Sequence, residues 1–138
     1  MSINIIVVES KVENADAIVE DLYQIVDLER CDMTIRKFSD CRESIQFVEE
    51  EGCDIAFVMV DGIRFSPQSF VKSLQRLNPR MNIIFCGREG GFLKDSWNLG
   101  LSGYLSLPVK KKDLLFEISE LRYYVWLPIR DELLALKN

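Results

Sequence analysis

Five short apolar segments, separated by stretches long enough for a helix, constrain the fold of this 138-residue chain more than any other feature. Short segments rich in valine, isoleucine and phenylalanine are typical of strands, and unbroken ones are typical of strands buried on both faces. The segments are Ile3 to Val8, Met33 to Ser39, the start of 54–65 (DIAFVMVDGIRF), Met81 to Cys86 and Gly103 to Leu107. No short hairpin loop joins them, and parallel strands need the crossover connection that a helix provides. The sequence therefore predicts a (βα)5 chain: an α/β fold with a doubly wound five-stranded parallel sheet.

Helix signals fill the intervals between these segments. In the first interval, apolar residues recur at spacings of three and four, the pattern of a helix with one buried side. Asp40 is the expected N-cap of the second helix, and Ser66 followed by proline is typical of the start of the third. Asn78 followed by proline predicts its end, because the residue before proline disfavours the α conformation. A shorter helix is expected around Phe92 to Leu99.

The C-terminal part of the chain combines a helix signal with aromatic residues. An apolar stripe predicts a long last helix that continues until Pro128 breaks it. The stripe consists of Leu114, Leu115, Ile118, Leu121 and Val125, and the aromatic residues are Tyr123, Tyr124 and Trp126. We expect these aromatic side chains to fold back on the domain or to pack on a partner chain. We accordingly divide the chain into a domain at residues 1–122 and a C-terminal helical extension at residues 123–138.

Composition excludes several classes of function. The chain has no histidine, which removes the commonest general base and the commonest metal ligand. The formal net charge of −5 argues against nucleic-acid binding by this domain itself, since that affinity comes from clustered Lys and Arg. The four cysteines lack CxxC spacing, no signal-peptide pattern is visible, and no apolar run approaches the ~18 residues of a membrane span. We expect one cytoplasmic domain with reduced thiols and no membrane segment.

The candidate site lies where the predicted strands end, because ligand chemistry in an open parallel sheet occurs at the carboxyl ends of the strands. The residues at these positions are Glu9 and Ser10, Met59 to Asp61, Cys86 to Arg88, and Ser106 to Pro108. Met59 and Asp61 should emerge on the same side of the third strand, because side chains alternate with period 2.

The order and spacing of the strands, together with the segment GLSGYLSLP at Gly100 to Pro108, carry a family resemblance. Over about Ile3 to Leu121 the chain resembles the receiver domain of bacterial response regulators, which implies a CheY-like, flavodoxin-like three-layer sandwich. Receivers move phosphate from a histidine kinase to an aspartate on the third strand. Acids after the first strand hold Mg²⁺, a lysine before the proline pairs with the phosphate, and a Ser or Thr after the fourth strand bonds to it. An aromatic residue on the fifth strand changes rotamer in response.

The resemblance places the phosphoacceptor position at a residue that cannot react. A register anchored on Asn78 and Pro108 aligns that position with Met59 and the lysine position with Leu107. A thioether cannot form an acyl phosphate, and a leucine cannot neutralise one.

The rest of the implied pocket is also altered. The acid pair becomes Glu9 and Ser10, and the hydroxyl position becomes Gly87, or Cys86 if the turn is one residue shorter. Tyr104 retains the aromatic position on the fifth strand. The resemblance thus implies a degenerate phosphorylation pocket.

We therefore predict a degenerate receiver that acts in signal transduction by protein contact without phosphorylation, catalyses nothing and needs no cofactor. Its expected switch and interaction surface includes Trp97 and Tyr104, on the face that receivers use for dimers and outputs. The expected partner is a protein, either a histidine kinase or an output protein, and a homodimer is also expected.

Two alternatives remain open. If the third strand ran two residues further, Asp61 could accept phosphate and share Mg²⁺ with Glu9, and the chain would be a working receiver. Alternatively, Met59, Leu107 and Cys86 could line an apolar pocket for a small ligand, and the chain would be a sensor. Without such roles, Glu9 should lie near water or bond to a neighbouring backbone N–H, and Asp61 should be a solvated carboxylate at a loop edge.

Overall fold

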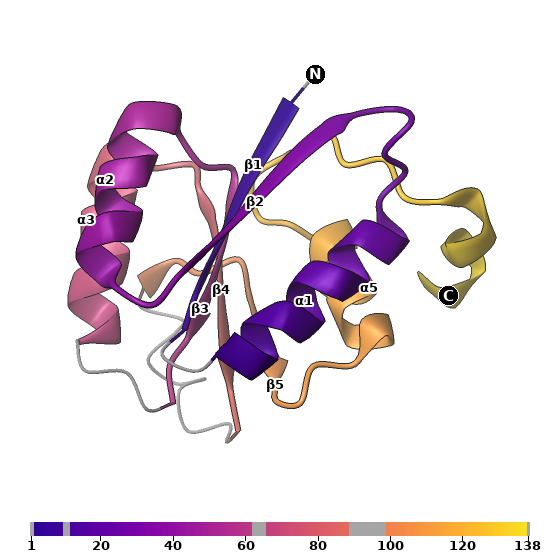
Figure 1. Ribbon diagram of the computed structural model, residues 1–138. Coiled ribbons are helices and arrows are strands. Elements are labelled where there is room, and N and C mark those ends of the chain that lie inside the picture. The colour runs from indigo at the N-terminus through magenta and orange to yellow at the C-terminus, as the bar shows by residue number, and fades with distance from the viewer. Residues whose placement is uncertain (1, 10–11, 62–65, 89–98, 138) are drawn as a thin grey trace.

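A five-stranded parallel sheet forms the middle layer of the structure (Figure 1). The computed structural model describes residues 2–9, 12–61, 66–88 and 99–137. The strands are β1 (Ser2–Val8), β2 (Asp32–Phe38), β3 (Ile55–Met59), β4 (Asn82–Gly87) and β5 (Gly103–Ser106). They lie in the order β2-β1-β3-β4-β5, and each neighbouring pair is parallel. The predicted doubly wound α/β fold is confirmed.

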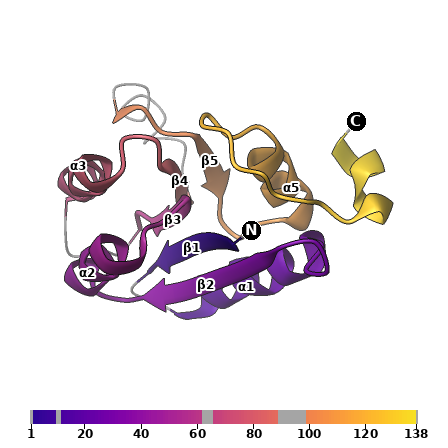
Figure 2. The ribbon, with the colours of Figure 1, turned by 90° about the horizontal axis from the view of Figure 1, so that it is seen from above.

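Helices cover both faces of the sheet, as the view from above shows (Figure 2). The helices α1 (Val12–Ile25) and α5 (Lys111–Ser119) lie on one face, and α2 (Cys41–Glu51) and α3 (Pro67–Leu77) lie on the other. A 3-10 helix, η2 (Asp131–Lys137), lies near the C-terminus. The helix expected around residues 92–99 falls outside the described residues, apart from Leu99. None of the helices in the described ranges is long and apolar enough to cross a membrane.

Two apolar clusters hold the three layers together. The α1/α5 cluster contains Ile5, Val7, Phe57 and Met59 from the sheet, with Ile18 and Leu22 from α1 and Leu114 and Ile118 from α5. The α2/α3 cluster contains Ile6, Val8, Ala56 and Val58, with Val48 from α2 and Phe70 and Leu74 from α3. Successive strand residues enter opposite clusters, which explains why the apolar runs of β1 and β3 are unbroken. Full burial of one such aliphatic side chain contributes about 1.5–3 kcal/mol.

The predicted helix boundaries on the α2/α3 face are confirmed. The Asp40 carboxylate accepts the N–H of Arg42 at 2.8 Å and caps α2. The Ser66 hydroxyl accepts the N–H of Ser69 at 3.3 Å, and α3 begins at the proline that follows Ser66. At the other end of α3, Asn78 leaves the helical conformation with its N–H still bonded to Leu74 O.

The prediction of a long last helix is wrong, because α5 ends at Ser119. From Leu121 onward the chain runs in an extended path across the amino-terminal end of the sheet (Figure 1). There the fully buried Asn82 side chain accepts the Tyr123 N–H at 2.8 Å and donates to the Tyr123 carbonyl at 2.8 Å. These bonds satisfy a buried amide that a continued helix would leave unpaired, and aromatic and β-branched residues in a run favour a helix weakly.

The rest of the tail packs back on the domain. Ile129 forms an antiparallel bridge with Val26, the Asp27 N–H donates to Pro128 O at 2.9 Å, and the Arg130 N–H donates to Ile25 O at 2.9 Å. Tyr123 and Trp126 are partly buried against the domain, as the first of the two arrangements expected for the aromatic tail requires, whereas Tyr124 is 81% exposed. Within residues 123–137 only η2 is helical, so most of the predicted helical extension is irregular or extended. The division of the chain at residue 122 remains a prediction.

Candidate functional site

Met59 is the last residue of β3, and its side chain is 1% exposed. It lies opposite Cys86 of β4 and packs inside the α1/α5 cluster. The position at which the resemblance places a reactive carboxylate is therefore filled by a buried thioether at the carboxyl edge of the sheet.

Cys86 beside it is fully buried in the same cluster. Burial raises the pKa of the Cys86 thiol far above its ordinary value, and the negative charges of Glu9 and Glu117 raise it further. The thiol thus stays protonated at neutral pH, and a protonated, enclosed thiol is neither a nucleophile nor a metal ligand.

Glu9 follows β1 and is buried, with 6% of its surface exposed. Its Oε2 accepts the backbone N–H of Ala15 at 2.6 Å, and its Oε1 accepts from Asn14 Nδ2 at 2.9 Å. A carboxylate at this position pairs one of the unsatisfied backbone N–H groups in the first turn of α1 and is favoured by the helix dipole. Glu9 therefore bonds to a neighbouring backbone N–H, as one of its two expected arrangements required. Ser10, its expected partner, lies outside the described residues.

Asp61 lies in the turn after β3 and is partly exposed. Its Oδ2 accepts the N–H of Arg88 at 2.6 Å and so connects the loop after β3 to the loop after β4. The expectation that Met59 and Asp61 share one side is wrong. Met59 packs in the α1/α5 cluster. Asp61 Oδ2 instead lies 3.5 Å from the position of a Cβ on Gly87, which is 2.9 Å from Val60 Cγ2 of the α2/α3 cluster, because strand alternation stops where β3 ends.

Gly87 and Tyr104 form a crowded contact of the site. A Cβ atom at Gly87 would lie 2.9 Å from Val60 Cγ2, 3.0 Å from Tyr104 Oη and 3.5 Å from Asp61 Oδ2. The phenol of Tyr104 therefore takes up space that a hydroxyl-bearing side chain at position 87 would need. Separations near 3.0 Å are below normal van der Waals contact between such atoms.

Glu117, on α5, is a site residue that the prediction missed. Its carboxylate accepts the backbone N–H of Tyr104 and lies directly against Gly103, where a Cβ would overlap Oε2. Burial raises the pKa of Glu117, the bond from Tyr104 opposes that rise, and the charges of Asp113 and Glu120 add to it. An acid on the apolar side of a helix, three residues after the buried Leu114, was the available sequence signal.

Leu107, at the expected lysine position, is half-buried and packs against the α1/α5 cluster. Its N–H donates to Gly87 O at 3.0 Å, and the peptide bond to Pro108 is cis. Trp97, assigned to the interaction surface, falls outside the described residues. Among the predicted positions, the structure thus brings together Asp61, Gly87 and Tyr104, and it buries Met59 separately.

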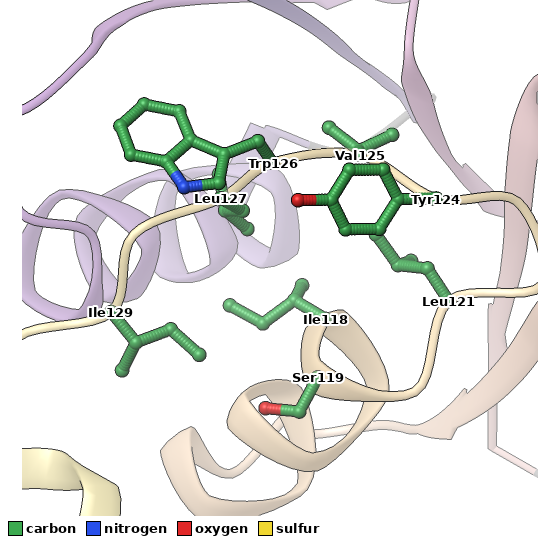
Figure 3. A pocket seen from close by; sticks show the side chains of 8 residues that line it. All are labelled: Ile118, Ser119, Leu121, Tyr124, Val125, Trp126, Leu127 and Ile129. Atoms are coloured by element: carbon green, nitrogen blue, oxygen red, sulfur yellow. The ribbon is translucent and has the colours of Figure 1, made fainter.

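Two of the cavities in the structure are lined by described residues alone. One of about 220 Å³ is lined by Glu9, Ala15, Lys37, Phe38 and Ser39. The other, of about 210 Å³, lies between the tail and α5 (Figure 3) and is lined by Ile118, Ser119, Leu121, Tyr124, Val125, Trp126, Leu127 and Ile129. Neither is lined by Met59, Cys86 or Leu107, the trio proposed from the sequence for an apolar ligand pocket.

The residues fit a Mg²⁺ ion poorly. That ion takes oxygen ligands, several of them from water and one or two from carboxylates. Both oxygens of Glu9 accept hydrogen bonds from α1, and Met59 offers sulfur at the position where the resemblance implies a carboxylate. In the ranges that the structure describes, no three His, Cys, Asp or Glu side chains are grouped as a metal site would require.

Neither a protein-family model nor a curated protein sequence matches this chain. Solved structures do match. A CheY-like response regulator receiver domain from Methanospirillum hungatei JF-1 superposes with a TM-score of 0.70 at 20% identity, over 87% of this chain and 93% of that one. The fold is that of a receiver domain. CheY4 of Vibrio cholerae matches with a TM-score of 0.70 at 15% identity, over 86% and 98% of the two chains.

The receiver domain of NtrX from Brucella abortus is similar as well, with a TM-score of 0.69 at 15% identity, over 83% of this chain and 94% of that one. The TM-scores establish the receiver fold. Identities this low do not establish the chemistry, which has to be argued from the residues present. In this receiver fold the carboxyl edge of the sheet carries the buried Met59, Glu9 bonded to α1, and Tyr104 with its phenol oxygen against Gly87.

Proposed function

We propose that this receiver-fold chain acts in signal transduction by protein contact that does not depend on phosphorylation. The observation that carries the proposal is Met59, which ends β3 opposite Cys86 and is 1% exposed. Phosphoryl transfer to a receiver needs a carboxylate oxygen that can reach the phosphorus atom, and a buried thioether provides none.

The surroundings of Met59 support the same proposal. The half-buried Leu107 supplies no cation for the charge that develops on a phosphoryl group. Both carboxylate oxygens of Glu9 accept hydrogen bonds at the start of α1, so a divalent ion would have to compete with these bonds for them. Asp61 is committed to the Arg88 N–H at 2.6 Å, so accepting phosphate would cost the bond between the two loops.

Under this proposal the protein has no catalytic residue and requires no cofactor. Its partner is a protein, either a histidine kinase or an output protein, and it forms a homodimer in the cytoplasm. Tyr104 and the expected Trp97 belong to the contacting surface. The net charge of −5 supports protein contact over nucleic-acid contact.

Acetyl phosphate with Mg²⁺ tests the proposal, read by intact-protein mass spectrometry. We expect no gain of a phosphoryl group, while a conventional receiver in the same mixture becomes phosphorylated. A gain in the wild type that Asp61→Asn abolishes would identify Asp61 as an acceptor and overturn the proposal. The amide of Asn can still accept the Arg88 N–H, so this variant removes the nucleophile and retains the loop contact.

A further inference from the structure

Tyr104 is contacted on two sides by residues of neighbouring elements, Gly87 of β4 and Glu117 of α5. On the phenol side, Gly87 leaves the space that Tyr104 Oη occupies, 3.0 Å from where a Cβ would be. On the backbone side, Glu117 accepts the Tyr104 N–H. The ring itself packs against the α2/α3 cluster.

The Glu117 contact depends on a second glycine. The Glu117 carboxylate lies against Gly103, and a Cβ there would overlap its oxygen atoms. Both contacts of Tyr104 therefore depend on a glycine. The phenol needs the space at Gly87, and the Glu117 carboxylate needs the space at Gly103. Neither glycine has a positive φ, so their backbone conformations do not require glycine, and the space they leave is the explanation that remains.

We propose that Gly87 and Glu117 are positioning residues that hold Tyr104 in one place, with its phenol against Gly87, in the unmodified protein. Tyr104 then needs no phosphate to reach this position, and the surface around β5 is presented to a partner in a single form. Gly87 is itself buried, so in this proposal it acts on that surface through its contact with Tyr104. The inference rests on the proposed phosphorylation-independent function and specifies how the partner-facing surface is set.

The position of Tyr104 can be read by ¹⁹F NMR of the full chain labelled with 3-fluorotyrosine. The chain has four tyrosines, and Tyr104→Phe assigns the signal of interest. A soluble gadolinium chelate broadens each signal according to its exposure, and Tyr124, which is 81% exposed, is the internal reference. We expect the wild-type Tyr104 signal to be single and to broaden several-fold less than that of Tyr124.

Gly87→Ala is the decisive variant, because the new Cβ conflicts with both Tyr104 Oη and Val60 Cγ2. We expect its Tyr104 signal to shift and to broaden more, toward the behaviour of Tyr124. The double variant Gly87→Ala with Val60→Ala removes the Val60 conflict and should leave Tyr104 displaced. An unchanged Tyr104 signal in Gly87→Ala, or its return in the double variant, would overturn the role of Gly87.

Glu117 is tested in the same way and does not depend on whether Gly87→Ala folds. Glu117→Gln keeps an acceptor for the Tyr104 N–H and should leave the signal unchanged, whereas Glu117→Ala should broaden or split it. Equal signals in the two variants would contradict the role of Glu117. A wild-type Tyr104 as accessible as Tyr124 would overturn the inference and leave the proposed function standing. Movement of Tyr104 on addition of beryllofluoride and Mg²⁺ would instead contradict the proposed function.

Discussion

The side chain of Asn82 holds the backbone of Tyr123 through two hydrogen bonds of 2.8 Å, one in each direction. Asn82 begins β4 and is fully buried, and Tyr123 lies 41 residues later in the tail. This pairing turns the chain away from α5 and lays the tail across the amino-terminal end of the sheet. It is one of several long-range contacts that hold the last part of the chain against the domain.

Asn82→Ala should lower the free energy of unfolding by about 1–3 kcal/mol, because it leaves the N–H and C=O of Tyr123 without their partner. Urea denaturation followed by far-UV circular dichroism measures the change. Gln46→Ala, which removes a side-chain bond at an exposed position of α2, is the control and should change stability by less than about 0.5 kcal/mol. Equal effects of the two substitutions would show that the Asn82–Tyr123 pair does not hold the tail.

Removal of residues 123–138 should destabilise the domain. Ile129 is 9% exposed and belongs to the α1/α5 cluster, and Val125 and Leu127 pack against that cluster. Truncation exposes the apolar surface beneath them, so we expect a lower melting temperature in calorimetry and a greater tendency to associate. A truncated chain as stable as the full one would support residues 1–122 as an independent domain.

Glu117 should make stability depend on pH. Its folded-state pKa is raised above that of the unfolded chain, mainly by burial, so its contribution to stability is fully present at low pH and is lost as the pH rises through the raised value. The charged or titratable groups that face it are Asp113 on α5, Glu120 directly after α5, and the Cys86 thiol on β4. Glu117→Gln should gain stability relative to the wild type as the pH rises from the acidic range toward neutrality.

Urea unfolding of wild type and Glu117→Gln over that pH range measures the difference. Glu49→Gln, at an exposed position of α2, serves as the control and should follow the wild type. If the free energies of unfolding of Glu117→Gln and wild type differed by the same amount at every pH, ionisation of Glu117 would not destabilise the folded protein.

Substitution of Met59 should act on the stability of the core. Met59→Leu conserves volume and should cost less than about 1.5 kcal/mol, whereas Met59→Ala leaves a cavity and should cost about 2–5 kcal/mol. Met59→Asp buries a charge without a partner and should be the most destabilising of the three. Thermal unfolding ranks the variants, and a tolerated aspartate would show that this position still accommodates a carboxylate.

The sheet and most helix boundaries follow from local sequence, because burial on both faces requires unbroken apolar strands such as Ile55–Met59. The caps at Asp40 and Ser66 are local as well, since each bonds to an N–H within three residues. Position along the chain also sufficed to find the candidate site, because parallel strands end at a common edge.

The remaining features depend on contacts between distant residues, which periodicity does not encode. The early end of α5 is tied to Asn82, and the role of Glu117 is tied to Tyr104 on another element. The side on which Asp61 lies depends on where β3 stops, and β3 stops two residues before Asp61. The sequence indicated only that Gly87 lacks the hydroxyl of the position it occupies. The structure adds that Tyr104 Oη lies in the space that a side chain at Gly87 would fill.

The most direct test of the central claim is a titration with Mg²⁺ and beryllofluoride, a phosphoryl mimic, followed by amide NMR. We predict no saturable shifts at Ala15, Arg88 or Leu107, whose N–H groups report on Glu9, Asp61 and the end of β5. Saturable shifts at these amides that Asp61→Asn abolishes would contradict the claim that this receiver fold works without phosphorylation.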